Sequence, residues 1–139
     1  MTARALLHKT FVILTLTATL LLSAGAQTGW SAVARIPFDF FVESTRMPRG
    51  DYTISSSSPT ILLFYNKTTK NTQQAFTGPA GPAVQKKDAK IVFVLFEQQY
   101  RFVGLRGIHG TWRTSADYLK TLPQGAKVIE IPVTYVNSN

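Results

Sequence analysis

The feature that most constrains the fold is a series of short, strand-forming segments separated by turn sequences. Residues 35–43 alternate in polarity, and the apolar members that would share one face are Ile36, Phe38, Phe40 and Val42. Strict alternation is typical of a half-buried strand, because successive side chains point to opposite faces. Similar segments recur roughly every eight to twelve residues, and no long stretch has helical periodicity. The pattern predicts an all-β fold, a single antiparallel sandwich or barrel-like domain of about seven strands.

The other strands are expected at residues 51–55, 60–65, 72–77, 90–96, 100–105 and 127–136. Residues 90–96 are apolar on both faces, so they are the best candidate for a central strand. Gly104 would mark a bulge or a close approach of two backbones. Breaks are expected at residues 55–59 and 78–82, which are rich in Ser or in Gly and Pro. A helical turn is expected from Thr114 to Leu119.

Two prolines and the C-terminal segment add detail. Pro37 lacks an N–H, so its strand should lie at an edge or pair only beyond the proline. Pro48 and Gly50 occupy favourable positions of a turn at residues 47–50. In the last strand, Ile129, Ile131, Val133 and Tyr135 should share one face.

The N-terminus is organised like a cleavable secretory signal peptide. Arg4 and Lys9 precede an uncharged apolar run over residues 11–22, and small residues at 24–26 form an A-x-A site. Cleavage after Ala26 would give a signal peptide at residues 1–26 and a single β-rich domain at residues 27–139. The mature domain would then be secreted or periplasmic, with no membrane span.

The alternative is a signal segment retained as a membrane anchor. A spanning helix needs about 20 apolar residues. The strongly apolar run ends at Leu22, and Gly25, Gln27 and Gly29 follow it. The pattern therefore favours cleavage over anchoring.

Composition limits how an exported domain of this size is held together. Removal of 26 of the 139 residues leaves 113, enough for one domain with a core. The chain has no cysteine, so it has no disulfides and no lipid-modified cysteine, and packing alone must stabilise it. The mature part keeps 13 of the 15 basic residues and all seven acidic ones, a net charge of about +6. These charges are scattered, so a nucleic-acid partner is not expected.

Two short motifs resemble a known family. Ile36-Pro-Phe-Asp-Phe40 and Met47-Pro-Arg-Gly-Asp-Tyr-Thr-Ile54 are similar to the P-F-D-F strand and L-P-x-G-x-Y-x-V turn and strand of small secreted bacterial proteins of unknown function. The resemblance covers roughly residues 36 to 123. Met47 replaces the usual Leu, and the chain ends in a strand-like segment where the family often has a charged helical tail. The resemblance implies secretion and β structure, and it supplies no catalytic residues.

The sequence offers little for catalysis or metal binding. The mature chain has a single histidine, His109, and the seven acidic residues are dispersed, so no metal site and no cofactor are expected. A triad of His109 with Asp117 and a serine is formally possible, but no G-x-S-x-G elbow is present. Asp39 and Glu43 would lie about 13 Å apart on one strand, farther than glycosidase carboxylates, and are interpreted as solvated outward positions.

The remaining lead combines an aromatic ring with basic residues. Trp112 lies in a Gly-rich region close in sequence to Arg106 and Arg113, and an exposed Trp beside Arg would suit a glycan or polyanion. The alternative is that the aromatic residues simply form the core. The tight group Lys86, Lys87 and Lys90 is interpreted as a solvated loop, with a binding patch as the alternative.

The leading functional hypothesis is an exported, non-catalytic β-domain with a binding or structural role in the cell envelope or outside the cell. Its partner would be an envelope glycan or another exported protein. One alternative is a glycan- or polyanion-binding module that uses Trp112, Arg106 and Arg113. Another alternative is a small hydrolase whose motifs are not recognised.

Overall fold

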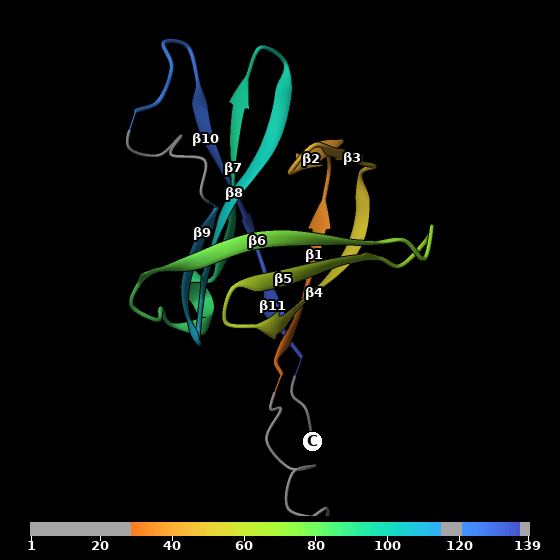
Figure 1. Ribbon diagram of the computed structural model, residues 1–139, viewed down its shortest axis with the longest axis vertical. Helices are drawn as coiled ribbons and strands as arrows, with labels where there is room; N and C mark the ends of the chain where they lie inside the picture. Colours follow the sequence, from red (N-terminus) through yellow and green to blue (C-terminus); the bar gives the residue numbers. More distant parts are fainter. Residues whose placement is uncertain (1–28, 115–120, 137–139) are drawn as a thin grey trace, which may run out of the picture.

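The computed structural model describes residues 29–114 and 121–136, which form eleven β-strands in one mixed sheet (Figure 1). The strands are β1 Ser31–Ile36, β2 Phe40–Val42, β3 Thr45–Met47, β4 Gly50–Ser58, β5 Ile61–Asn66, β6 Thr72–Gly81, β7 Lys90–Phe96, β8 Gln99–Gly107, β9 Gly110–Thr114, β10 Lys127–Pro132 and β11 Thr134–Tyr135. A short 3-10 turn, η1, covers Lys86–Asp88. The all-β prediction is confirmed, whereas the expectation of about seven strands was too low.

The strand order is β10-β7-β8-β9-β6-β5-β4-β1-β11, with the β2–β3 hairpin attached to β8. β2 pairs with β8 in parallel, so the expectation of a purely antiparallel sheet was wrong at this point. β10 and β11 stand at opposite ends of the order, although only Val133 separates them in the chain. The last segment thus pairs with β7 through β10 and with β1 through β11. The finer choice between a sandwich and a barrel-like arrangement stays a prediction.

The strand expected over residues 35–43 is split in two. β1 ends at Ile36, immediately before Pro37, and β2 begins only at Phe40. Because proline has no N–H to donate, pairing stops there and the chain turns toward β8. The apolar side chains of Ile36, Phe40 and Val42 are nevertheless fully buried, as the alternation predicts.

Two of the expected breaks were wrong. β4 continues through the serines to Ser58, and β6 continues through Gly78 and Pro79 to Gly81. In both strands a shift in register absorbs the unfavourable sequence, between Ser56 and Ser58 in β4 and between Pro79 and Gly81 in β6. Bulges are where a sheet tolerates residues that cannot complete a regular ladder.

Strands are present at the other expected positions, but residues 127–136 form two strands, β10 and β11, and not one. β7 is an interior strand, between the edge strand β10 and β8. Ile129, Ile131, Val133 and Tyr135 all contact the main core, as predicted. The predicted signal peptide at residues 1–26 lies outside the described residues. So does the expected helical turn, apart from Thr114.

Aromatic packing forms the centre of the core. The ring of Phe40 lies 5.2 Å from that of Tyr52, 6.0 Å from that of Phe64 and 5.2 Å from that of Phe93, centroid to centroid. Such tilted and edge-to-face pairs contribute about 0.5–1.5 kcal/mol each beyond their buried area. In a chain without disulfides, this packing joins β2, β4, β5 and β7.

Both ends of the domain lie together. Ala32 of β1 pairs with Tyr135 of β11, and the Val136 N–H donates to the Ser31 carbonyl at 3.0 Å. β1 enters and β11 leaves at one end of the molecule, whereas the β7–β8 hairpin projects at the other (Figure 1).

Gly104 allows two strands to approach closely, as its position in the sequence predicts. Val92 pairs with Gly104 and Phe93 with Phe102, so Val103 is the extra residue of a bulge. A Cβ atom on residue 104 would lie 2.7 Å from the Trp112 carbonyl oxygen. This contact involves backbone, so a side chain could not be accommodated by rotation of a neighbour.

We expect Gly104→Ala to lower the free energy of unfolding by about 1–3 kcal/mol, because the added methyl group forces β8 and β9 apart. Urea denaturation followed by tryptophan fluorescence would measure the change. Gly78→Ala is the matched control, since nothing lies within 4 Å of its Cβ position. Equal midpoints for the two variants would contradict the close approach.

Candidate functional site

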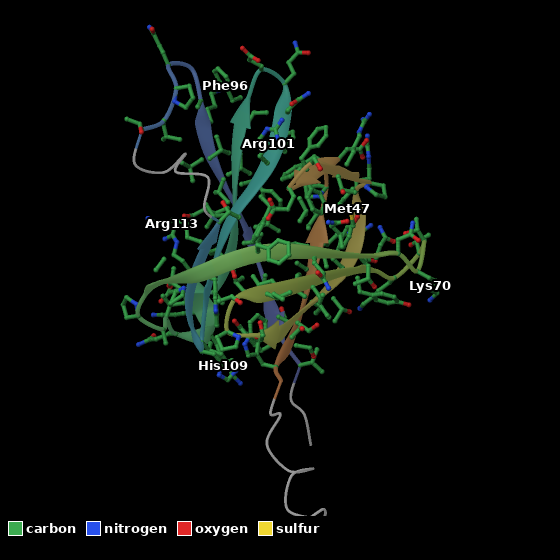
Figure 2. The ribbon with its side chains drawn as sticks, viewed as in Figure 1. Met47, Lys70, Phe96, Arg101, His109 and Arg113 are labelled. Carbon is green, nitrogen blue, oxygen red and sulfur yellow. The ribbon has the colours of Figure 1, made fainter. Side chains whose placement is uncertain are left out.

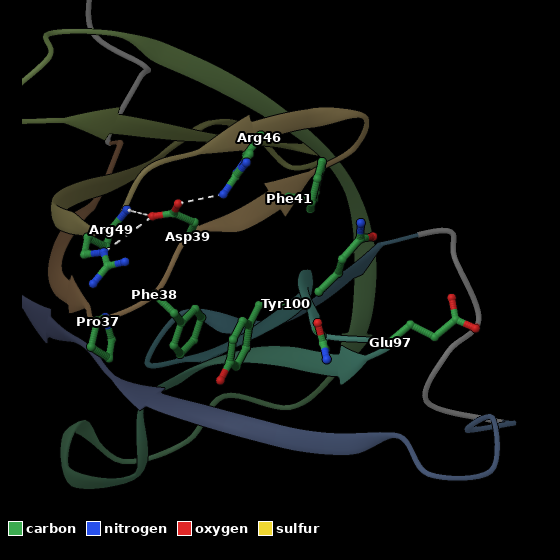
Figure 3. A pocket seen from close by; sticks show the side chains of 10 residues that line it. Pro37, Phe38, Asp39, Phe41, Arg46, Arg49, Glu97 and Tyr100 are labelled. Atoms are coloured by element: carbon green, nitrogen blue, oxygen red, sulfur yellow. Dashed lines mark hydrogen bonds and ion pairs between the residues drawn. The ribbon is translucent and has the colours of Figure 1, made fainter.

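A polar pocket of about 470 Å³ opens where two neighbouring segments near the start of the domain meet a third that is distant in sequence (Figure 3). The β1–β2 connection and β2 contribute residues 37–39 and Phe41. The β3–β4 region contributes Arg46 and Arg49. The β7–β8 turn and the start of β8 contribute residues 97–100. The pocket therefore depends on the parallel pairing of β2 with β8, which brings Phe40 opposite Tyr100.

An aromatic stack runs from the core to the pocket. The rings of Phe38 and Tyr100 are stacked, with centroids 3.7 Å apart and planes 11° from parallel. Behind them, Phe38 meets the fully buried ring of Phe93 edge-on at 5.1 Å. Because Phe38 is held between these two rings, the aromatic wall of the pocket is fixed by the core.

Charged groups surround one carboxylate at the pocket. Oδ1 of Asp39 accepts a hydrogen bond from the Arg49 backbone N–H at 2.9 Å, and Oδ2 accepts one from Nη2 of Arg46 at 3.0 Å. Nε of Arg49 lies 3.6 Å from Oδ1. The Arg49 backbone N–H and the two guanidinium groups hold the pKa of Asp39 below its ordinary value, against a smaller opposing effect of desolvation. Asp39 thus points outward as predicted, but it is paired.

The turn that carries Arg49 has a local explanation. The hydroxyl of the buried Tyr52 donates a hydrogen bond to the Pro48 carbonyl, which fixes the corner between β3 and β4. Gly50 has φ +151°, a conformation that residues with a side chain rarely adopt. The buried Met47 anchors the start of the turn. This corner accounts physically for the M-P-R-G-D-Y motif and directs Arg49 to the pocket.

The β7–β8 turn uses residues that turn geometry does not favour. Glu97 and Gln98 have φ values of +50° and +64°, between the paired residues Phe96 and Gln99. A two-residue hairpin with both central φ values positive favours Asn and Gly, and other residues are held there at a cost of about 1–3 kcal/mol each. The turn therefore consists of residues 97 and 98, and its geometry does not explain why Glu and Gln occupy it.

The structure places the three residues of the sequence-predicted site close together. Trp112, Arg106 and Arg113 do line one pocket, a smaller one of about 280 Å³. Of the two alternatives for Trp112, exposure is wrong and core packing holds: the residue is 9% exposed and its ring lies 5.3 Å from that of Trp30. Alternation along β9 turns Trp112 toward the core and leaves Arg113 on the opposite face. Arg106 forms an ion pair with Glu130.

His109 lies away from the polar pocket, at the end of the molecule where β1 enters (Figure 2). Its ring is stacked on Trp30, with centroids 5.9 Å apart and planes 16° from parallel. Beside it, the Tyr135 hydroxyl accepts a hydrogen bond from the Ile108 N–H at 3.3 Å, and burial raises the pKa of Tyr135. The other proposed member of a triad, Asp117, lies outside the described residues.

Asp39 and Glu43 do not share a strand. Asp39 precedes β2, whereas Glu43 follows it and accepts a hydrogen bond from the Phe76 N–H at 3.1 Å. Within residues 29–114 and 121–136, no group of three or more His, Cys, Asp or Glu side chains is placed to hold a metal ion. The same part of the chain contains no helix with the length and apolarity needed to cross a membrane.

Sequence reasoning did not identify the polar pocket, because its residues come from separate segments. Phe38 and Tyr100 both stand in or beside segments that the sequence predicts as strands, and nothing in the sequence pattern distinguishes Arg46. The one available signal was the clustering of Asp39, Arg46 and Arg49 around two strand-forming motifs. No family model matches the chain, and searches of curated proteins and of solved structures also give no match.

The lowered pKa of Asp39 predicts a specific pH dependence. A carboxyl group with a depressed folded-state pKa stabilises the fold above its ordinary pKa of 3.8 and loses that contribution as the pH falls through the folded-state value. The stability advantage of the native chain over Asp39→Asn should therefore be largest near neutral pH and shrink below pH about 4. Urea midpoints measured across this range would test it.

Asp51→Asn is the control for that measurement. Asp51 is exposed in β4, and among the described residues its carboxylate has no recorded ion pair. A difference between the native chain and Asp39→Asn that stays constant from pH 7 to about pH 2 would contradict the role of the Asp39 carboxylate.

Proposed function

We propose that this chain is an exported, non-catalytic carbohydrate-binding domain, and that it binds its ligand at the polar pocket between the β1–β2 connection, the β2–β3 hairpin and the β7–β8 turn. The observation that carries the proposal is the convergence of the Phe38–Tyr100 stack with Asp39 and two exposed arginines. The signal-peptide pattern and the resemblance to small secreted proteins support export. The partner would be a glycan of the cell envelope or its surroundings.

The chemistry of the pocket fits a sugar. A pyranose has an apolar C–H face that packs on an aromatic ring, and hydroxyl groups that both donate and accept hydrogen bonds. The same pocket is lined by Tyr100, by the carboxamides of Gln98 and Gln99, which can both donate and accept, and by Arg46 and Arg49, which only donate. A largely preformed cleft with a few convergent polar groups is the usual form of a small-ligand site.

The two carboxylates at the pocket, Asp39 and Glu97, are also better suited to a binding role than to catalysis. The Asp39 carboxylate already accepts hydrogen bonds from Arg46 and Arg49, which lowers its pKa and makes it a poor proton donor. Glu97, the other carboxylate at the pocket, is exposed in the hairpin turn. Retaining and inverting glycosidases need one carboxyl group with a raised pKa. We therefore favour binding over hydrolysis.

We expect Tyr100→Ala and Arg49→Ala each to weaken binding of oligosaccharides on an immobilised envelope-glycan panel by about tenfold, because each removes a contact of roughly 1.4 kcal/mol. Arg113→Ala, on the opposite face of β9, should bind like the native chain. Incubation with the same glycans should release no new reducing ends. Arg49 is 73% exposed at its side chain, so its variant is expected to fold.

The controls separate the competing interpretations. Loss of binding in Arg113→Ala but not in Arg49→Ala would move the site to the smaller pocket with Arg106. Steady release of reducing ends would favour the hydrolase alternative. Absence of binding across the panel would reject the carbohydrate proposal.

A further inference from the structure

The charged groups that line the polar pocket are unevenly paired. Arg46 and Arg49 share the single carboxylate of Asp39. Arg101 follows Tyr100 in β8 and holds its guanidinium 5.1 Å from the centre of the Phe41 ring, where Nη2 donates to the neutral amide oxygen of Gln99 at 3.2 Å. Two arginines, Arg46 and Arg49, thus line the pocket with one carboxylate bonded between them, and Arg101 lies next to it. The second carboxylate of the lining, Glu97, has no recorded ion pair among the described residues.

Arg49 is the cation with the most unused hydrogen-bonding capacity. Its backbone N–H, and not its guanidinium, makes the hydrogen bond to Asp39. Nε is 3.6 Å from the carboxylate, and the side chain is 73% exposed. Within the described part of the chain, no acceptor is recorded for its two Nη groups. Figure 3 shows the guanidinium beyond Asp39, on the same side of the site as Pro37 and Phe38. A planar guanidinium with free N–H groups matches an oxyanion with two oxygens.

We propose that the ligand is an acidic sugar whose carboxylate or phosphate is bound by the Arg49 guanidinium while its ring lies against the Phe38–Tyr100 wall. This inference rests on the proposed carbohydrate-binding function and adds the charge of the ligand. Asp39 keeps Arg46 and the Arg49 backbone in place, and its negative charge restricts binding to anions that approach from the open side of Arg49. The net positive charge of the mature chain assists the encounter.

The test uses pairs of oligosaccharides that differ only in charge. Uronic acid oligomers of gluco, galacto and manno configuration are each compared with the same oligomer after reduction of its carboxyls to alcohols, together with one phosphorylated oligosaccharide and its dephosphorylated form. Isothermal titration with the full mature chain should show at least about tenfold tighter binding of the acidic member of a pair, and the preference should fall with added salt. The pair that shows it identifies carboxylate or phosphate as the anion.

Variants assign the preference to Arg49. Arg49→Gln keeps the backbone N–H bonded to Asp39 and should remove the preference for the acidic member. Arg49→Lys, which keeps the charge without the planar fork, should retain only part of it. Arg35→Gln removes an exposed positive charge from β1 and is the control that should leave the preference unchanged.

Equal binding of acidic and neutral members by the native chain would overturn this inference and leave the carbohydrate-binding function standing. A preference that survives in Arg49→Gln would overturn the assignment to Arg49. Absence of binding to every pair would reject the proposed function, and this inference with it.

Discussion

The burial of Phe40 is the interaction on which the rest of the structure depends. β2 has only three residues, too few to hold its position by backbone pairing alone, yet Phe40 is completely buried against rings from β4, β5 and β7. This contact seats the β2–β3 hairpin on the sheet and keeps β2 parallel to β8. The residues on either side are placed as a result: Phe38 and Asp39 before Phe40, and Phe41 after it, all face the pocket.

Much of the fold is predictable from the alternation of polar and apolar residues. The β class, the interior strand at residues 90–96, the core-facing side chains of the C-terminal segment and the bulge beside Gly104 all follow from local pattern. The number of strands does not follow from local pattern. The composition of residues 55–59 and 78–82 predicts breaks there, whereas β4 and β6 continue to Ser58 and Gly81 because they pair with neighbouring strands. The interruption at Pro37 has the opposite cause. The alternation of residues 35–43 predicts one continuous strand, but the missing N–H of the proline ends the backbone pairing.

The site is less predictable than the fold. Trp112 stands out in the sequence as an aromatic residue between glycines and arginines, but strand parity turns its ring inward onto Trp30. Tyr100 looks like one more strand residue, and only the parallel contact between β2 and β8 makes it part of a cavity wall. Parallel pairing of a three-residue strand leaves no periodic signal in the sequence. A site assembled from three short segments is therefore visible only once the pairings are known.

The two ends of the domain lie side by side, and this determines which way the pocket faces when the domain is attached to something else. Because β1 and β11 are neighbours, anything joined before Ser31 or after Val136 would emerge from the same end of the molecule. The β2–β3 hairpin and the β7–β8 turn, whose residues line the pocket, lie toward the opposite end (Figure 1). Attached to a bead, a stalk or a neighbouring domain through either end, the domain would therefore present the pocket on the side away from the attachment.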